Sequence, residues 1–188
     1  MPSARLTVRF FHTVTKEFAT DFIDALKTQL DLQVSVVEYG NQGIPASGLT
    51  TPDAAITVVN DLVYSGGFTN LEQAIAECQK TLEGSPAPVM VVVGDGVANK
   101  FGNPATGDAA SARPAAANAA TAAKDAGIQI ATAHFDDVYL TPEGAEFFEQ
   151  EIASPGLAFG PLLDPVLFPE LAQELADALF ERVECSSN

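Results

Sequence analysis

The feature that most constrains the fold is the apolar run Val89–Val93, which is followed by an aspartate between two glycines, Asp95. Such a run is typical of a strand in a parallel sheet, because these strands are buried on both faces. The flanking glycines let the backbone bend sharply, which leaves the Asp95 carboxylate at the carboxyl end of the strand. Open α/β sheets bind their ligands at this edge. The run therefore predicts a sheet with a binding site at its carboxyl-end rim.

The rest of the chain alternates between strand and helix patterns. The predicted strands cover 6–12, 33–39, 88–93, 128–135 and 157–159. The predicted helices cover 16–30, 51–62, 71–82, 114–126, a segment that starts at Thr141, and 165–183, and a polar loop covers 97–113. Alternating strands and helices indicate a parallel sheet with helices on both faces. We expect a doubly wound α/β fold in one domain, residues 1–188.

A second motif lies before the helix predicted at 71–82. The loop Tyr64–Asn70 contains two glycines and brings Thr69 to the start of this helix. Together with Val93–Gly96, this loop resembles the von Willebrand factor type A domain. Two further stretches resemble it as well, Gln33–Gly40 and Ala126–Ala133. The resemblance covers nearly the whole chain and implies the doubly wound fold, with a short antiparallel edge strand within residues 40–50.

The resemblance also implies a metal-ion-dependent adhesion site on the rim. In the family, this site has the pattern Asp-x-Ser-x-Ser after the first strand, a threonine in the second loop and an aspartate after the central strand. Thr69 and Asp95 match the second and third parts. In the first part, Phe11 stands where the family has aspartate, and Thr13 and Thr15 occupy the serine positions. The implied metal ligands are therefore Thr13, Thr15, Thr69 and Asp95.

Oxygen ligands of this kind suit Mg²⁺ or Mn²⁺. Because Phe11 replaces a carboxylate, the attraction for a divalent ion is reduced, and we expect metal binding to be weak or absent. Shifting the alignment by one residue would put His12 at the aspartate position. Val14 and Lys16 would then replace both hydroxyls, so we use the first alignment.

The same rim is expected to contact a protein ligand, for example through an acidic side chain of that ligand. The residues expected there are His12, Gly67, Phe68, Asn70, Asn99, His134 and Asp136. The implied function is a non-catalytic binding module for adhesion or protein–protein interaction, located outside the cell or on its surface. Two alternatives stay open. One is a metal-dependent enzyme that uses His12, Asp95 and His134, and the other is a purely structural assembly domain.

Signals for an enzyme are otherwise weak. The sequence contains no Gly-x-Ser-x-Gly turn, no Gly-x-Gly-x-x-Gly after the first predicted strand and no Gly-Lys-Ser/Thr loop. These are the motifs of hydrolases, dinucleotide-binding enzymes and nucleoside triphosphatases. We therefore expect a protein that is not an enzyme.

The charge of the chain excludes some partners. Nine Lys and Arg residues stand against 25 Asp and Glu residues, a net charge of −16. Such a surface repels nucleic acid and anionic membranes, and no apolar run has membrane-spanning length. No secretion signal is recognised in the sequence. Either the protein is cytosolic or its leader is missing from this sequence, and the extracellular location is implied by the resemblance alone.

The two cysteines, Cys78 and Cys185, lie on different predicted helices. They are too far apart in sequence for a zinc knuckle. A disulfide in an oxidising compartment and two free thiols are both compatible with the sequence.

Overall fold

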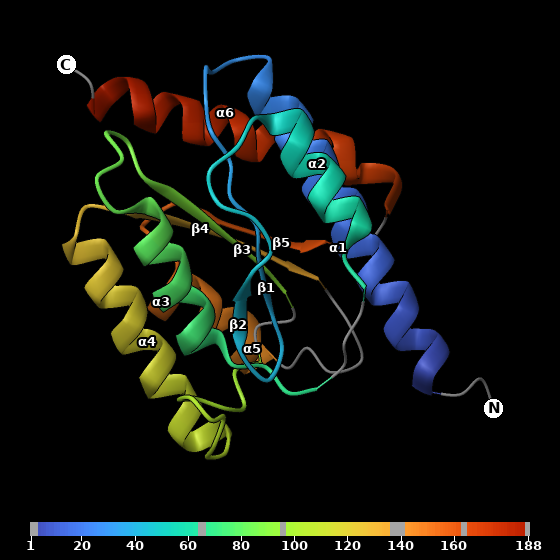
Figure 1. Ribbon diagram of the computed structural model, residues 1–188, viewed down its shortest axis with the longest axis vertical. Coiled ribbons are helices and arrows are strands. Elements are labelled where there is room, and N and C mark those ends of the chain that lie inside the picture. Colours follow the sequence, from blue (N-terminus) through green and yellow to red (C-terminus); the bar gives the residue numbers. More distant parts are fainter. Residues whose placement is uncertain (1–3, 64–66, 95–96, 136–141, 163–164, 187–188) are drawn as a thin grey trace.

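The computed structural model describes residues 4–63, 67–94, 97–135, 142–162 and 165–186 (Figure 1), without the side chains of 4–13, 142, 161–162, 165 and 183–186. Its elements are, in order, α1 (Ala4–Lys27), β1 (Val37–Tyr39), β2 (Gly43–Pro45), α2 (Pro52–Asp61), α3 (Leu71–Leu82), β3 (Val89–Gly94), α4 (Ala109–Asp125), β4 (Gln129–Phe135), α5 (Pro142–Phe147), the π-helical turn η1 (Phe148–Ile152), β5 (Ala158–Leu162), the 3₁₀ turn η2 (Pro165–Leu167) and α6 (Phe168–Ser186). No helix within these ranges is long and apolar enough to cross a membrane.

Three parallel strands form the main sheet, in the order β3-β4-β5. Met90 of β3 lies opposite Ile130 of β4, and Thr132 of β4 lies opposite Ala158 of β5. The parallel α/β arrangement predicted from the strand and helix alternation is therefore confirmed. β5 extends three residues beyond the predicted 157–159, to Leu162.

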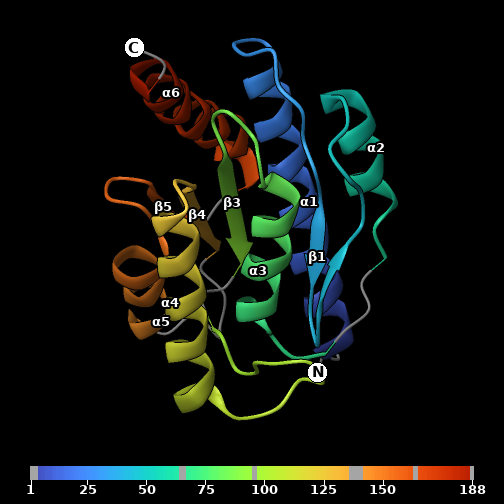
Figure 2. The same ribbon diagram turned by 60° about the vertical axis from the view of Figure 1, so that its left-hand side comes forward.

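Helices cover both faces of this sheet, because side chains alternate between the faces along each strand. Ala131, Ala133 and Phe135 of β4 pack into one core with α1, α2 and α6. Met90 and Val92 of β3 pack into a second core with α3, α4 and η1. Figure 2 shows α1 and α2 on one side of β3 and α4 on the other. The predicted helices on both faces are confirmed.

Three phenylalanines join α1, β4 and α6 in the first core. The ring of Phe18 lies edge-on to Phe135 at 6.0 Å and to Phe168 at 5.8 Å between centroids. Phe22 and Leu26 are buried beside them. Phe18, Phe22 and Leu26 are thus the buried face of the helix predicted at 16–30.

The strand predicted at 6–12 is wrong, because this segment belongs to α1. No glycine or proline occurs between Ser3 and Tyr39, so no local signal separates the segment from the amphipathic helix that follows it. Adding a residue to an existing helix costs much less free energy than starting a new one. Helix propagation here overrides the β-propensity of the valine and phenylalanine residues.

The β1–β2 hairpin forms a second, antiparallel sheet in which Glu38 lies opposite Ile44. It confirms the short edge strand expected within 40–50. The strand predicted at 33–39 is reduced to β1 and an isolated bridge between Val34 and Thr50. Within the described ranges no strand ladder joins this hairpin to β3. The complete doubly wound sheet is thus not confirmed, since the segment predicted as its first strand is helical.

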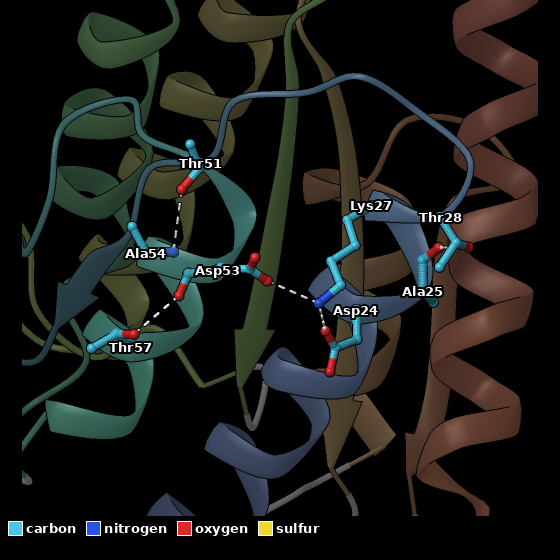
Figure 3. A network of polar contacts seen from close by, with 8 residues as sticks. All are labelled: Asp24, Ala25, Lys27, Thr28, Thr51, Asp53, Ala54 and Thr57. Atoms are coloured by element: carbon cyan, nitrogen blue, oxygen red, sulfur yellow. Dashed lines mark hydrogen bonds and ion pairs between the residues drawn. The ribbon is translucent and has the colours of Figure 1, made fainter.

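One lysine ties the end of α1 to the start of α2 (Figure 3). Lys27 Nζ lies 2.5 Å from Asp24 Oδ1 and 2.9 Å from Asp53 Oδ1. The hydrogen bond to Asp24, and then the one to Asp53, raises the pKa of Lys27. The N–H of Ala54 donates to the Thr51 hydroxyl, which caps α2 as the Thr-Pro-Asp sequence predicts.

α4 begins at Ala109, five residues before the predicted start at Pro114. Asp108 provides the cap, since its Oδ1 accepts the N–H of Ser111 at 3.0 Å, and the hydrogen bonds with Ser111 lower the pKa of Asp108. Pro114 cannot donate to the carbonyl of Ala110, but Ala110 is exposed, so water can bind that carbonyl. The buried face of α4 consists of Ala112, Ala116, Ala120 and Ala123.

The cysteine alternatives are partly resolved. Cys78 is a free thiol on α3, so it forms no disulfide with Cys185, whose side chain is outside the described set. The Cys78 side chain packs against the second core. Burial, with a smaller contribution from Glu77, raises the pKa of Cys78 to about 11.

Candidate binding site

Three loops meet at the carboxyl ends of the strands: 40–42 between β1 and β2, 67–70 before α3, and 98–107 before α4. We call them the loop platform. In Figure 2 they lie below the arrowhead of β3. Hydrogen bonds from three asparagine side chains hold the loops against one another.

Asn70 is at the centre of the loop platform and is fully buried. Its Nδ2 donates to the carbonyl of Gly102 at 2.8 Å and to that of Asn41 at 3.1 Å. Its Oδ1 accepts the N–H of Gln73 at 3.2 Å, which caps α3. One side chain therefore contacts all three loops. The residue that caps α3 is Asn70, one position after the threonine that the sequence indicated.

Asn41 fixes the tip of the second loop. Its Oδ1 accepts the N–H of Phe68 at 2.9 Å. Gly67 has a φ of +112°, and a Cβ built on it would lie 2.7 Å from the same Oδ1. A glycine at this position is required for both reasons, its backbone conformation and the close approach of Asn41.

Asn99 joins the second loop to the third through Thr69. Its Oδ1 accepts the N–H of Thr69 at 2.8 Å, and its own N–H donates to the Thr69 carbonyl at 3.0 Å. The backbone of Lys100 donates to the same carbonyl at 3.2 Å. In addition, Glu72 Oε2 accepts the N–H of Gly102 at 2.8 Å. The backbone of Thr69 is thus fixed by the third loop.

The loop platform exposes an aromatic side chain to solvent. Phe68 is 54% exposed although its backbone is fixed. Lys100 Nζ lies 4.7 Å from the centroid of the Phe68 ring and donates to the carbonyl of Gly107. This cation–π contact holds the ring from one side. An exposed aromatic ring on a fixed backbone, beside a positive charge, is suited to contact another molecule.

Gly94, at the end of β3, has a different role from the bend that the sequence indicated. Its φ is not in the left-handed region. A Cβ on Gly94 would instead collide with the hydroxyl of Tyr39. That hydroxyl donates to the carbonyl of Val93 at 2.9 Å and connects the hairpin to β3.

The structure describes three of the four residues assigned to the metal site, and of these Thr13 is described without its side chain. Thr13 and Thr15 lie inside α1 rather than after a strand, because the predicted first strand is helical. Thr69 is in the loop platform, and Asp95 lies outside the described residues. In the described part of the chain, no group of three His, Cys, Asp or Glu residues could hold a metal ion. The assignment of the metal ligands therefore stays a prediction.

The residues predicted for the partner-binding rim differ in their accessibility. Gly67 and Phe68 are exposed, and Asn99 is partly buried. Asn70 is completely buried and His134 is only 6% exposed, so both are inaccessible to a partner. His12 is in α1 with its side chain outside the description, and Asp136 lies in an undescribed segment. The enzyme alternative with His12, Asp95 and His134 therefore stays untested.

Sequence reasoning missed Asn41, Glu72 and Lys100. Asn41 lies in Gly40–Gly43, whose composition indicates a turn, but no local signal connects that turn to Phe68. The contacts of Glu72 and Lys100 join residues about 30 positions apart in the chain. Such contacts depend on the tertiary fold alone.

Solved structures with a similar fold include a pilus adhesin, SpaC from Lactobacillus rhamnosus GG, with a TM-score of 0.69 and 14% identity over 92% of this chain and 28% of the adhesin. Proximal thread matrix protein 1 from the mussel byssus gives a TM-score of 0.68 and 16% identity over 94% of this chain and 43% of that protein. A von Willebrand factor type A protein from Catenulispora acidiphila gives a TM-score of 0.60 and 14% identity over 90% of this chain and 38% of that protein.

At identities this low, the likeness to these proteins is one of fold alone. The fold of this chain is similar to the von Willebrand factor type A fold. The chain spans less than half the length of each of the three proteins. In one structure of the byssus protein, zinc occupies the metal-ion-dependent adhesion site (MIDAS) motif. No protein-family model and no curated protein matches the sequence.

Proposed function

We propose that this chain is a non-catalytic module that binds a protein partner through the loop platform. The observation that carries the proposal is the exposed Phe68 on a loop whose backbone is fixed by Asn41, Asn70 and Asn99. Aromatic residues at the centre of an interface contribute much of the binding free energy in protein complexes. Phe68 would be the main contact residue and Lys100 its neighbour.

Preorganisation favours this use of the loop platform. Ordering a loop on binding costs conformational entropy, which is subtracted from the affinity. Here Phe68 N–H and Thr69 N–H already have side-chain acceptors at 2.9 and 2.8 Å. The partner would therefore meet a surface that needs little ordering.

The structural neighbours support a role in adhesion. They include a pilus adhesin and a thread matrix protein of similar fold. By analogy with them we propose that this chain acts outside the cell or on its surface. We further propose that binding needs no metal ion, because the threonines of the first part of the metal pattern lie in α1.

A peptide-display selection tests the proposal. Phage-displayed peptides are selected on the wild-type protein, and the affinity of the enriched peptides is measured by fluorescence anisotropy. Phe68→Ala should weaken binding at least about tenfold, as expected for a main contact residue. Leu49→Ala is the matched control: it removes a side chain that is 40% exposed and lies after β2, away from the loop platform. This control should change the affinity less than about twofold.

The selection also has a clear negative outcome. If peptides bind Phe68→Ala as tightly as the wild type, the loop platform is not the binding surface. Circular dichroism of both variants shows whether the fold is kept. Phe68 is exposed, so we expect its removal to leave the fold intact.

A further inference from the structure

Arg113 differs from the other cations of the chain. It lies four residues after Ala109, the first residue of α4, and about 6 Å from that residue along the helix axis. Its guanidinium carbon is 5.8 Å from the centroid of the Phe147 ring. Phe147 is itself buried, with 7% exposure. The guanidinium carbon lies over this ring within the range of a cation–π contact.

Among the Lys and Arg side chains that the structure describes, Arg113 alone has no hydrogen-bond acceptor. Lys27 and Lys80 contact carboxylates. The others donate to backbone carbonyls: Lys16 to Asn60, Lys100 to Gly107, Lys124 to Glu151 and Arg182 to Pro155. Arg113 has no such contact, and its Nε is buried without a partner. In a chain with 25 carboxylates, an unpaired guanidinium is unexpected.

The geometry defines which atoms remain available for a ligand. Of the three guanidinium nitrogens, only Nε is a buried atom without a partner, so the two terminal nitrogens are accessible. They can donate to both oxygens of one carboxylate in parallel hydrogen bonds. The cation–π contact with Phe147 favours one placement of the guanidinium, which lowers the entropy lost on binding.

We propose that Arg113 binds a carboxylate, namely an Asp or Glu side chain of the protein partner. The identification of the partner rests on the proposed function of the loop platform. A carboxylate is favoured over a phosphate because the net charge of −16 repels anions in proportion to their charge. A carboxylate with one negative charge is repelled less than a phosphate with nearly two.

The test follows the Nε–H signal of Arg113 by NMR, which a buried Nε makes observable. The probes are N-acetylglutamate amide, N-acetylglutamine amide and inorganic phosphate. The glutamate probe should shift the Arg113 signal in a saturable manner, while the glutamine probe leaves it unchanged and phosphate binds more weakly. The signal of Arg182, which is exposed and bonded to Pro155, should not move and serves as the internal control.

Variants separate this inference from the proposed function. Arg182→Gln should leave the response of the Arg113 signal to the glutamate probe unchanged. Arg113→Gln and Arg113→Lys remove the Nε–H that is followed, so these two variants are compared by their affinity for peptides, and Arg113→Lys should bind more weakly than the wild type. Peptides selected on the wild type that contain Asp or Glu should bind Arg113→Gln at least tenfold more weakly. If Phe68→Ala weakens these peptides and Arg113→Gln does not, the inference fails and the proposed function stands.

Three further results would overturn the inference. One is an Arg113 signal that responds to the glutamate probe no more than to the glutamine probe. Another is an equal response of Arg182, which would indicate unspecific binding. The third is tighter binding of phosphate, which would show a phosphate site instead. If the glutamate probe binds Arg113 but selected peptides do not depend on Phe68, the proposed function fails instead.

Discussion

At the scale of single residues, the loop platform depends on a property of asparagine that aspartate lacks. A side-chain amide donates two hydrogen bonds and accepts others at the same time. Asn70 uses both abilities, since it donates to two carbonyls and accepts one N–H. An aspartate could cap α3 equally well, but it would leave the carbonyls of Asn41 and Gly102 without a donor. The residue type follows from this combination.

We predict that Asn70→Ala lowers the free energy of unfolding by about 2–4 kcal/mol, because it removes a helix cap and leaves buried polar groups unpaired. Asn118→Ala is the control: Asn118 is exposed on α4, and alanine is the better helix former, so this change should be neutral or slightly stabilising. Urea unfolding followed by circular dichroism measures both. An Asn70→Ala variant as stable as the wild type would contradict the central role of Asn70.

At the scale of elements, β3 is one of the two edge strands of the main sheet. In the described part of the chain it pairs with β4 on one side and with no strand on the other. The N–H of Gln129 donates to the carbonyl of Pro88. In a parallel ladder this directs the N–H groups of Met90 and Val92 toward β4, and those of Val91 and Val93 away from it. On that open side, the carbonyl of Val93 accepts the Tyr39 hydroxyl.

Native-state hydrogen exchange should show this alternation. We expect the amides of Met90 and Val92 to exchange at least about tenfold more slowly than those of Val91 and Val93. The amides of β4, which has a strand on each side, provide the reference for full protection. Equal protection of all four β3 amides would show that another strand pairs with the open edge. The first candidate would then be residues 6–12, with their strand-like sequence.

The elements also show which parts of the fold follow from the sequence. Thr51 caps α2 and Asn70 caps α3, each directly before the first residue of its helix. Both helices were predicted. α1 was predicted only in part, because no glycine or proline marks a boundary before its amphipathic half. Of the site, exposed Phe68 could be predicted from its loop. Arg113 could not, because its lack of an acceptor depends on how α4 packs against α5.

At the scale of the whole molecule, the net charge of −16 sets the response to salt. Like charges repel one another in the compact state, and salt screens this repulsion. Only two lysines form ion pairs with carboxylates among the described residues. Most carboxylates are therefore without a cationic partner there, so added salt should raise the melting temperature.

This general response must be separated from binding of Mg²⁺ at a specific site. We predict that millimolar MgCl₂ raises the melting temperature of the wild type and of Asp95→Asn by the same amount, within about 1 °C, because a weak or absent site adds nothing to screening. A site filled at 100 times its dissociation constant would add about 2.7 kcal/mol. For a domain of this size that corresponds to roughly 5–10 °C. Calorimetry in NaCl at matched ionic strength gives the screening baseline. A larger rise in the wild type than in Asp95→Asn would establish a metal site on the rim.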